Sequence, residues 1–154
     1  MKKIIYLFIL LPFAISSQCR VNVELTQKQS YCGGAKPPPE LLAQLEKPIP
    51  YANKKLVLVS ANGKTTTVST NSKGILKLKL KPGSYKLYEP WRFYKKTPDN
   101  SDIKNFDKAC LEPQWNKADV TIDAQKDKQH IEINLDDIYC AHTIPCLTNP
   151  HYPE

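Results

Sequence analysis

Residues 56–89 read LVLVSANGKTTTVSTNSKGILKLKLKPGSYKLYE. This stretch contains short runs of β-branched or alternating residues, which occupy residues 56–60, 65–70, 75–80 and 84–89. Glycine-containing turns separate the runs, and Asn62-Gly63 is the strongest hairpin signal in the chain. Leucine alternates with lysine over residues 76–81, which is typical of a strand with one buried face. The stretch therefore predicts consecutive strands joined by tight turns.

Strand patterns continue on both sides of this stretch. Residues 20–26 (RVNVELT) alternate between polar and apolar side chains, as expected for a half-buried strand. Downstream, residues 119–122 and 130–135 are predicted to form the last hairpin. About seven short strands separated by turns indicate an all-β fold of the β-sandwich type.

Two segments break the strand pattern. Residues 40–47 (ELLAQLEK) are predicted to form a short helix that begins near Pro39 and ends before Pro48. Residues 90–118 form a long insertion without clear periodicity, apart from a helical turn expected around residues 106–111. The sequence therefore predicts one sandwich domain with a short helix and a long insertion.

Two motifs in the central stretch resemble a known family. They are TNSKG at residues 70–74 and LKPGSY at residues 80–85. With them the chain resembles the carboxypeptidase regulatory-like (transthyretin-related) domain. The resemblance implies a seven-stranded Greek-key β-sandwich in which residues 20–26 and 130–135 are outer strands. Members of that family are mostly non-catalytic modules attached to enzymes, receptors and surface proteins, so the resemblance implies a fold and not an active site.

Three residues of these motifs have expected structural roles. Gly74 and Gly83 are expected at positive φ, which glycine adopts without steric cost. Tyr85 is expected to form a tyrosine corner, in which the ring is packed and the hydroxyl bonds a nearby backbone group. A ligand-binding role is the alternative for Tyr85.

The first residues are typical of a secretory signal peptide. A basic start precedes an apolar run at residues 4–15, which is shorter than the roughly 20 residues that span a bilayer. Small residues follow, and cleavage is expected after Ser17, with Ser16 as the alternative. The expected organisation is a signal peptide at residues 1–17 and a single β-sandwich domain at residues 18–154. Its core spans about residues 20–135, and a cysteine-containing tail follows.

Charge and export together limit the expected partners. The chain has 154 residues and carries 22 Lys and Arg against 15 Asp and Glu, a net charge of +7. A modest basic excess on an exported chain does not favour nucleic acid. The alternating lysines at positions 77, 79 and 81 are expected on the solvent face of a strand, with a polyanion or membrane-surface role as the alternative.

The expected location is secreted, periplasmic or on the outer surface. Cys19 follows the predicted cleavage site directly and is expected to be free, lipidated or bonded to another chain. Membrane association is expected only if Cys19 is lipidated. The bulky Gln18 in front of it does not fit a lipoprotein signal.

Cysteines later in the chain are expected to form structural disulfides, because exported proteins meet an oxidising environment. They are Cys32, Cys110, Cys140 and Cys146, and they allow three connectivities. We predict Cys110–Cys140, which ties the insertion to the end of the last strand, and Cys32–Cys146, which ties the first loop to the tail.

A metal site is the alternative for the tail. Cys140, His142 and Cys146, with His151 as a further ligand, supply the thiolate and imidazole groups that bind zinc or copper. Oxidised cysteines are not thiolate ligands, so this reading competes directly with the disulfides. The disulfides are preferred, and no cofactor is expected.

The aromatic and basic segment 88–96 (YEPWRFYKK) is a candidate partner face. Aromatic side chains with arginine are enriched in interfaces, which favours a protein or carbohydrate partner. The candidate residues are Tyr88, Trp91, Arg92, Phe93 and Tyr94. The preferred alternative is that Trp91 and Phe93 pack over the open end of the sandwich.

Glu89 suggests one more alternative. The segment 85–89 (YKLYE) is similar to the Tyr-x-Leu-x-Glu strand of the collagen-adhesin B-repeat domains. In those domains a buried glutamate promotes a lysine–asparagine cross-link between the first and last strands. Asn134 would be the acceptor here, but the first strand has no lysine before Lys28. An ordinary exposed acid is the simpler reading of Glu89.

Catalytic motifs are absent from the sequence. It contains no Gly-x-Ser-x-Gly elbow, no phosphate-binding loop and no His-Glu-x-x-His pattern. We therefore expect an exported, non-catalytic binding or structural module and not an enzyme.

Overall fold

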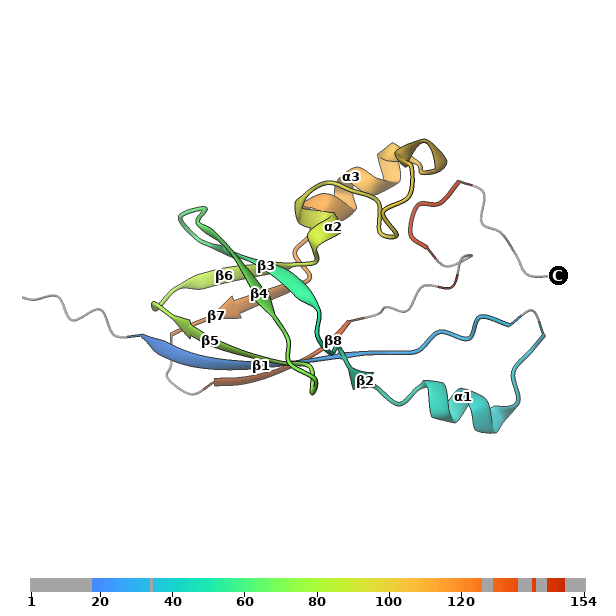
Figure 1. The fold of residues 1–154 in the computed structure, drawn as a ribbon, viewed down its shortest axis with the longest axis horizontal. Helices are drawn as coiled ribbons and strands as arrows, with labels where there is room; N and C mark the ends of the chain where they lie inside the picture. The colour runs from blue at the N-terminus through green and yellow to red at the C-terminus, as the bar shows by residue number, and fades with distance from the viewer. Residues whose placement is uncertain (1–17, 34, 126–128, 136–139, 141–143, 149–154) are drawn as a thin grey trace, which may run out of the picture.

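The computed structural model describes residues 18–33, 35–125, 129–135, 140 and 144–148. In this part of the chain, strands form two packed sheets (Figure 1). The first sheet contains β1 (Cys19–Gln27), β2 (Ile49–Pro50), β5 (Ile75–Leu80) and β8 (Gln129–Leu135). The second sheet contains β3 (Lys55–Ser60), β4 (Thr65–Ser69), β6 (Ser84–Tyr88) and β7 (Val120–Asp123). The all-β sandwich is confirmed, and β2 is a two-residue addition to it.

β1 is the central strand of the first sheet. β5 pairs antiparallel with residues 19–24, and β8 pairs in parallel with residues 21–27 on the opposite edge. The expectation that residues 20–26 form an outer strand is therefore wrong. Val21, Val23 and Leu25 are completely buried because they face the second sheet from this central strand, whereas Asn22 on its other face is exposed.

β7 and β8 do not form the predicted hairpin. β7 pairs antiparallel with β6 in the second sheet, whereas β8 lies beside β1 in the first sheet. Each of them supplies a neighbour to a strand that would otherwise leave backbone hydrogen-bonding groups unpaired. The chain therefore crosses from one sheet to the other between Asp123 and Gln129.

The main core lies between the two sheets. Strand alternation directs one set of side chains inward from each sheet. From the first sheet come Val21, Val23, Leu25, Leu76, Leu78 and Leu80, and from the second come Leu56, Leu58, Leu87, Val120 and Ile122.

The TNSKG turn binds the edge of β1. The side-chain oxygen of Asn71 accepts hydrogen bonds from the backbone N–H groups of Lys73 and Ile75, at 2.9 and 3.0 Å. Gly74 has φ +75°, and its carbonyl accepts from the N–H of Leu25 at 2.9 Å. A Cβ atom at Gly74 would lie 2.4 Å from the Leu25 carbonyl oxygen, so the turn requires glycine for space as well as conformation.

The LKPGSY motif also behaves as expected. Gly83 has positive φ, at +146°. The hydroxyl of Tyr85 donates a hydrogen bond to the carbonyl oxygen of Lys81 at 2.9 Å. The ring of Tyr85 packs against the main core. The predicted tyrosine corner is confirmed.

Short helices lie outside the sheets. α1 (Pro39–Leu45) matches the predicted helix, lies on an arm between β1 and β2, and buries none of its residues (Figure 1). The insertion contains α2 (Pro90–Phe93), the 3₁₀ turn η1 (Ile103–Asn105) and α3 (Lys108–Asn116). α3 begins later than the helical turn predicted around residues 106–111, because Asp107 caps it by accepting from the N–H of Ala109.

The insertion forms a second, smaller core. Trp91, Phe106 and Leu111 are buried in it. The C-terminal segment completes this core with Ile144 and Leu147, which pack against the buried residues. The insertion is therefore a folded layer at one end of the sandwich (Figure 1).

The four later cysteines are oxidised, but the predicted pairing is wrong. The disulfides are Cys32–Cys140 and Cys110–Cys146. The parallel register of β1 and β8 places Gln27 opposite Leu135, and Cys32 and Cys140 each lie five residues further along the chain. Cys110 meets Cys146 because the tail returns to α3, where the N–H of Asp107 donates to the carbonyl of Cys146 at 2.9 Å.

Cys19 is a free, buried thiol in this structure, at the first position of β1 opposite Leu80. The predicted signal peptide, His142 and His151 lie outside the described residues. None of the helices in the described residues is long and apolar enough to cross a membrane.

Candidate functional site

α2 is fixed to the rest of the insertion through Arg92. Its Nε lies 2.8 Å from Oδ1 of Asp119, which makes an ion pair between two side chains that are 13% and 7% exposed. Its Nη1 donates to the backbone carbonyl and the side-chain oxygen of Gln114, at 3.0 and 2.9 Å. The guanidinium lies 4.3 Å from the centre of the Trp91 ring, within cation–π range. These contacts join α2 to α3 and to the residue before β7.

Glu89 is a buried link between the sheets. Its carboxylate accepts hydrogen bonds from the hydroxyl of Tyr51 and, at 2.8 Å, from Nε1 of Trp91. Its backbone N–H donates to Oδ2 of Asp119 at 2.6 Å. Tyr51 directly follows β2 in the first sheet, and Glu89 directly follows β6 in the second. The reading of Glu89 as an ordinary exposed acid is therefore wrong.

The cross-link alternative also loses support. β1 has no lysine in its sequence CRVNVELTQ, so the first strand supplies no amine opposite β8. Asn134 lies opposite Thr26 in the backbone register. The carboxylate of Glu89 is instead used by Tyr51 and Trp91.

Asp119 places a second carboxylate, close to Glu89, in a largely buried position. Burial raises the pKa of its carboxyl above the ordinary value of 3.8. The hydrogen bond from the N–H of Glu89 and the charge of Arg92 oppose this rise in pKa, and the charge of Glu89 adds to it.

The five residues of the predicted partner face divide into two groups. Trp91 is buried and Arg92 is turned into its ion pair, so both have structural roles. Tyr88, Phe93 and Tyr94 remain at the surface as a contiguous group, which we call the aromatic patch. The ring centres of Tyr88 and Phe93 are 6.1 Å apart, and those of Phe93 and Tyr94 are 5.1 Å apart with an edge-to-face geometry.

Exposure across the aromatic patch is uneven. Tyr94 is 57% exposed, whereas Tyr88 and Phe93 are half-buried. Tyr88 alternates with the fully buried Leu87 along β6, so it projects from the outer face of the second sheet. The exposed Lys95 and Lys96 follow the patch directly. The patch therefore exposes aromatic rings beside two lysines, and the contacts of Arg92 hold α2, which carries Phe93, in place.

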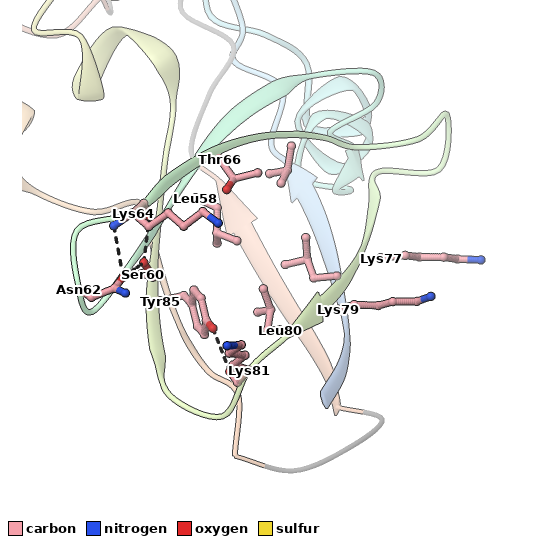
Figure 2. A pocket seen from close by; sticks show the side chains of 12 residues that line it. Leu58, Ser60, Asn62, Lys64, Thr66, Lys77, Lys79, Leu80, Lys81 and Tyr85 are labelled. Atoms are coloured by element: carbon pink, nitrogen blue, oxygen red, sulfur yellow. Dashed lines mark hydrogen bonds between the residues drawn. The ribbon is translucent and has the colours of Figure 1, made fainter. Parts of the chain in front are cut away.

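A groove that the sequence did not predict opens between the sheets (Figure 2). It has a volume of about 520 Å³ and lies between the outer strands β4 and β5. Its floor is apolar, and the residues that form it are Leu58, Val68, Leu78, Leu80 and Tyr85. Thr66 faces the same interior as Leu58, its β3 partner, yet it is exposed, because nothing in the described residues covers this edge. A threonine at an inward position of β4 is the one sequence signal for this opening.

Lysines surround the groove. Figure 2 shows Lys77 and Lys79 directed away from it, on the outer face of β5. Lys64 and Lys81 also line the groove. Among the described residues, none of these four lysines forms an ion pair with a carboxylate. Within the described residues, lysines without a carboxylate partner therefore lie both at the groove, as Lys64 and Lys81, and on the outer face of β5, as Lys77 and Lys79.

The alternative metal site does not form in the disulfide-bonded chain. Cys140 is bonded to Cys32 and Cys146 to Cys110, so both sulfur ligands are consumed. Among the described residues, no group of three His, Cys, Asp or Glu side chains is arranged to hold a metal ion.

Comparison with known proteins finds similarity to solved structures only. No protein family and no curated protein matches the chain. The Bacillus anthracis TIE protein is similar with a TM-score of 0.39 and 16% identity, over 77% of this chain and 17% of that one. A DUF3823 family protein from Bacteroides ovatus is similar with a TM-score of 0.34 and 15% identity, over 76% of this chain and 43% of that one. The chain spans less than half the length of either structure.

Proposed function

We propose that the chain is an exported, non-catalytic β-sandwich module that binds a protein or carbohydrate partner through the aromatic patch. Two disulfides support export, because such bonds persist in oxidising compartments. The proposed location is secreted, periplasmic or on the outer surface. The TNSKG and LKPGSY turns support a relationship to carboxypeptidase regulatory-like domains, whose members are mostly binding or structural modules.

The observation that carries this proposal is the display of Tyr94. This large ring is 57% exposed and stands at the edge of Phe93, at the end of a helix that Arg92 ties to Asp119 and Gln114. Burying a rigid aromatic side chain costs little conformational entropy compared with the area it contributes. The patch therefore resembles the aromatic anchors of interfaces more than it resembles a core residue left uncovered.

The test compares the mature protein with its Tyr94→Ala variant on an array of soluble and insoluble polysaccharides. A photoreactive phenylalanine at position 94 tests for a protein partner in intact cells. We expect Tyr94→Ala to weaken binding at least tenfold while leaving the midpoint of urea unfolding unchanged. Leu42→Ala is the matched control, because Leu42 is also exposed but lies on α1. Equal binding by the wild type and a triple alanine variant of the patch would refute the proposal.

A further inference from the structure

Two unpaired strand edges meet at the groove. In the described residues, β4 pairs only with β3, and β5 pairs only with β1. Half of the backbone groups of an edge strand point away from its partner and are free to pair with another strand. The backbone N–H and carbonyl of Ile75 are already bonded to Asn71, so the free edge of β5 begins after Ile75, and it borders the groove through Leu78 and Leu80.

The interior of the groove suits alternate apolar side chains. Leu58, Leu78 and Leu80 line it together with Val68, and Thr66 lines it from β4. A strand added along β5 would direct every second side chain between the sheets, onto this floor. Apolar side chains at those positions would cover leucines that are otherwise 5–8% exposed.

The lysines on the outer face of β5 favour an added strand that carries negative charge. Lys77 and Lys79 project from that face, and Lys79 already lies opposite Arg20 in the register with β1. Side chains directly opposite each other on neighbouring strands are only about 4.5–5.5 Å apart at their Cβ atoms. Carboxylates on the added strand would therefore lie beside Lys77 and Lys79, which form no ion pair with a carboxylate among the described residues. A second copy of β5 would place lysine beside lysine, so self-association at this edge is opposed.

We propose that the groove binds an extended segment of another protein, in which apolar and acidic residues alternate, as an additional strand on β5. The apolar residues enter the groove and the acidic residues lie beside Lys77 and Lys79. This site lies between the sheets, whereas the aromatic patch lies on the outer face of the second sheet, so the two proposals are independent.

The experiment measures binding of a fluorescein-labelled peptide, EVEVEVE with blocked ends, to the mature disulfide-bonded protein by fluorescence anisotropy at physiological salt. A peptide of the same composition, EEVVVEE, keeps the charge but removes the alternation. A third peptide, KVKVKVK, keeps the alternation but reverses the charge. We expect EVEVEVE to bind at least tenfold more tightly than either of the others.

Matched variants locate the site. Lys77→Glu with Lys79→Glu is expected to weaken binding at least tenfold. Lys55→Glu with Lys86→Glu makes the same change of charge on exposed positions of the second sheet and is expected to change binding less than threefold. Hydrogen exchange is expected to slow for the backbone amides of Lys77 and Lys79, which point away from β1, when the peptide is bound. Tyr94→Ala is expected to leave peptide binding unchanged.

Several outcomes would overturn the proposal. Equal binding of EVEVEVE and EEVVVEE would mean attraction by charge alone, and absence of binding by EVEVEVE would exclude the added strand. If the two double variants weakened binding equally, the peptide would not be bound at β5. Slower exchange in β4 without any change in β5 would place the peptide on the wrong edge.

Discussion

The hydroxyl of Tyr51 donates a hydrogen bond to the carboxylate of Glu89, and both residues are at least nine-tenths buried. Because Tyr51 follows β2 and Glu89 follows β6, the bond joins the two sheets at the end where the insertion begins. A buried carboxylate is costly unless its oxygens are satisfied, and here each oxygen accepts one hydrogen bond.

Tyr51→Phe tests this link. Removing a hydrogen bond to a charged acceptor is expected to lower the free energy of unfolding by about 1.5–3 kcal/mol. Tyr85→Phe is the control, because it removes a hydrogen bond from a hydroxyl to a neutral, exposed carbonyl and should cost only about 0.5–1.5 kcal/mol. Urea unfolding measures both. Equal losses of unfolding free energy in the two variants would show that the hydrogen bond from Tyr51 to the Glu89 carboxylate is no stronger than one to a neutral carbonyl.

Gly63 and Gly74 have similar φ angles, so comparing them separates the cost of the backbone conformation from the cost of steric contact. Gly63 has φ +79°, and no atom lies within 4 Å of the position that a Cβ would occupy there, whereas a Cβ at Gly74 would lie 2.4 Å from the Leu25 carbonyl oxygen. Gly63→Ala is expected to cost about 1–2 kcal/mol, the usual penalty of the left-handed conformation. Gly74→Ala is expected to cost about 4 kcal/mol or more, because backbone must also move. Similar unfolding midpoints for the two variants would contradict the tight contact with β1.

Asp119 is expected to make stability depend on pH. Burial raises the pKa of its carboxyl in the folded protein above 3.8, so the folded state binds the proton more tightly than the unfolded state does. Its contribution to stability therefore increases as pH falls from above the raised pKa towards 3.8. The stability of the wild type relative to Asp119→Asn should rise between pH 7 and pH 4, as measured by urea unfolding at each pH. A constant or falling difference would contradict the raised pKa.

The disulfides are expected to differ in their effect on stability. In the loop-entropy description, a disulfide stabilises more when it closes a longer loop. Replacing Cys32 and Cys140 by serine opens a loop of 108 residues and should cost about 5 kcal/mol, against about 4 kcal/mol for Cys110 and Cys146, whose separation is 36. Mass spectrometry of a non-reduced digest tests the pairing itself. A peptide linking Cys110 to Cys140 would contradict it.

Local pattern was sufficient to predict the strands. The predicted strand at residues 75–80 coincides with β5, and the one at residues 20–26 lies within β1. Alternation of polar and apolar residues indicates a strand with one buried face, and it does so whichever strand pairs with it. Alternation does not show which strands pair, and this is why the predicted hairpin of β7 and β8 was wrong. Nothing in residues 130–135 distinguishes a neighbour at β7 from a neighbour at β1, which is about a hundred residues away. The Cys32–Cys140 bond follows the β1–β8 register, which local pattern does not contain, so the sequence could not choose it among the three connectivities.

The candidate sites depended on tertiary contacts that local pattern does not contain. α2 is one turn long, so its sequence has no period that separates the buried Trp91 from the exposed Tyr94. Packing against α3 and the tail decides which rings are covered. The groove exists because β4 and β5 end their sheets on the same side, and only Thr66 at an inward position hinted at it.

The Cys32–Cys140 bond also determines how the domain would respond to mechanical force. Tension applied between Cys19 and Cys140 runs along β1 to Cys32 and crosses the disulfide directly to Cys140. The bypassed segment spans a sequence separation of 108 and adds no extension, which removes roughly 360–390 Å of contour length. Because β1 is already extended and β5 and β8 belong to the bypassed segment, the covalent backbone of β1 carries this tension and its hydrogen bonds to β5 and β8 do not. The disulfide-bonded domain is therefore expected to extend very little under force, and reduction of Cys32–Cys140 would allow the intervening segment to unfold and extend.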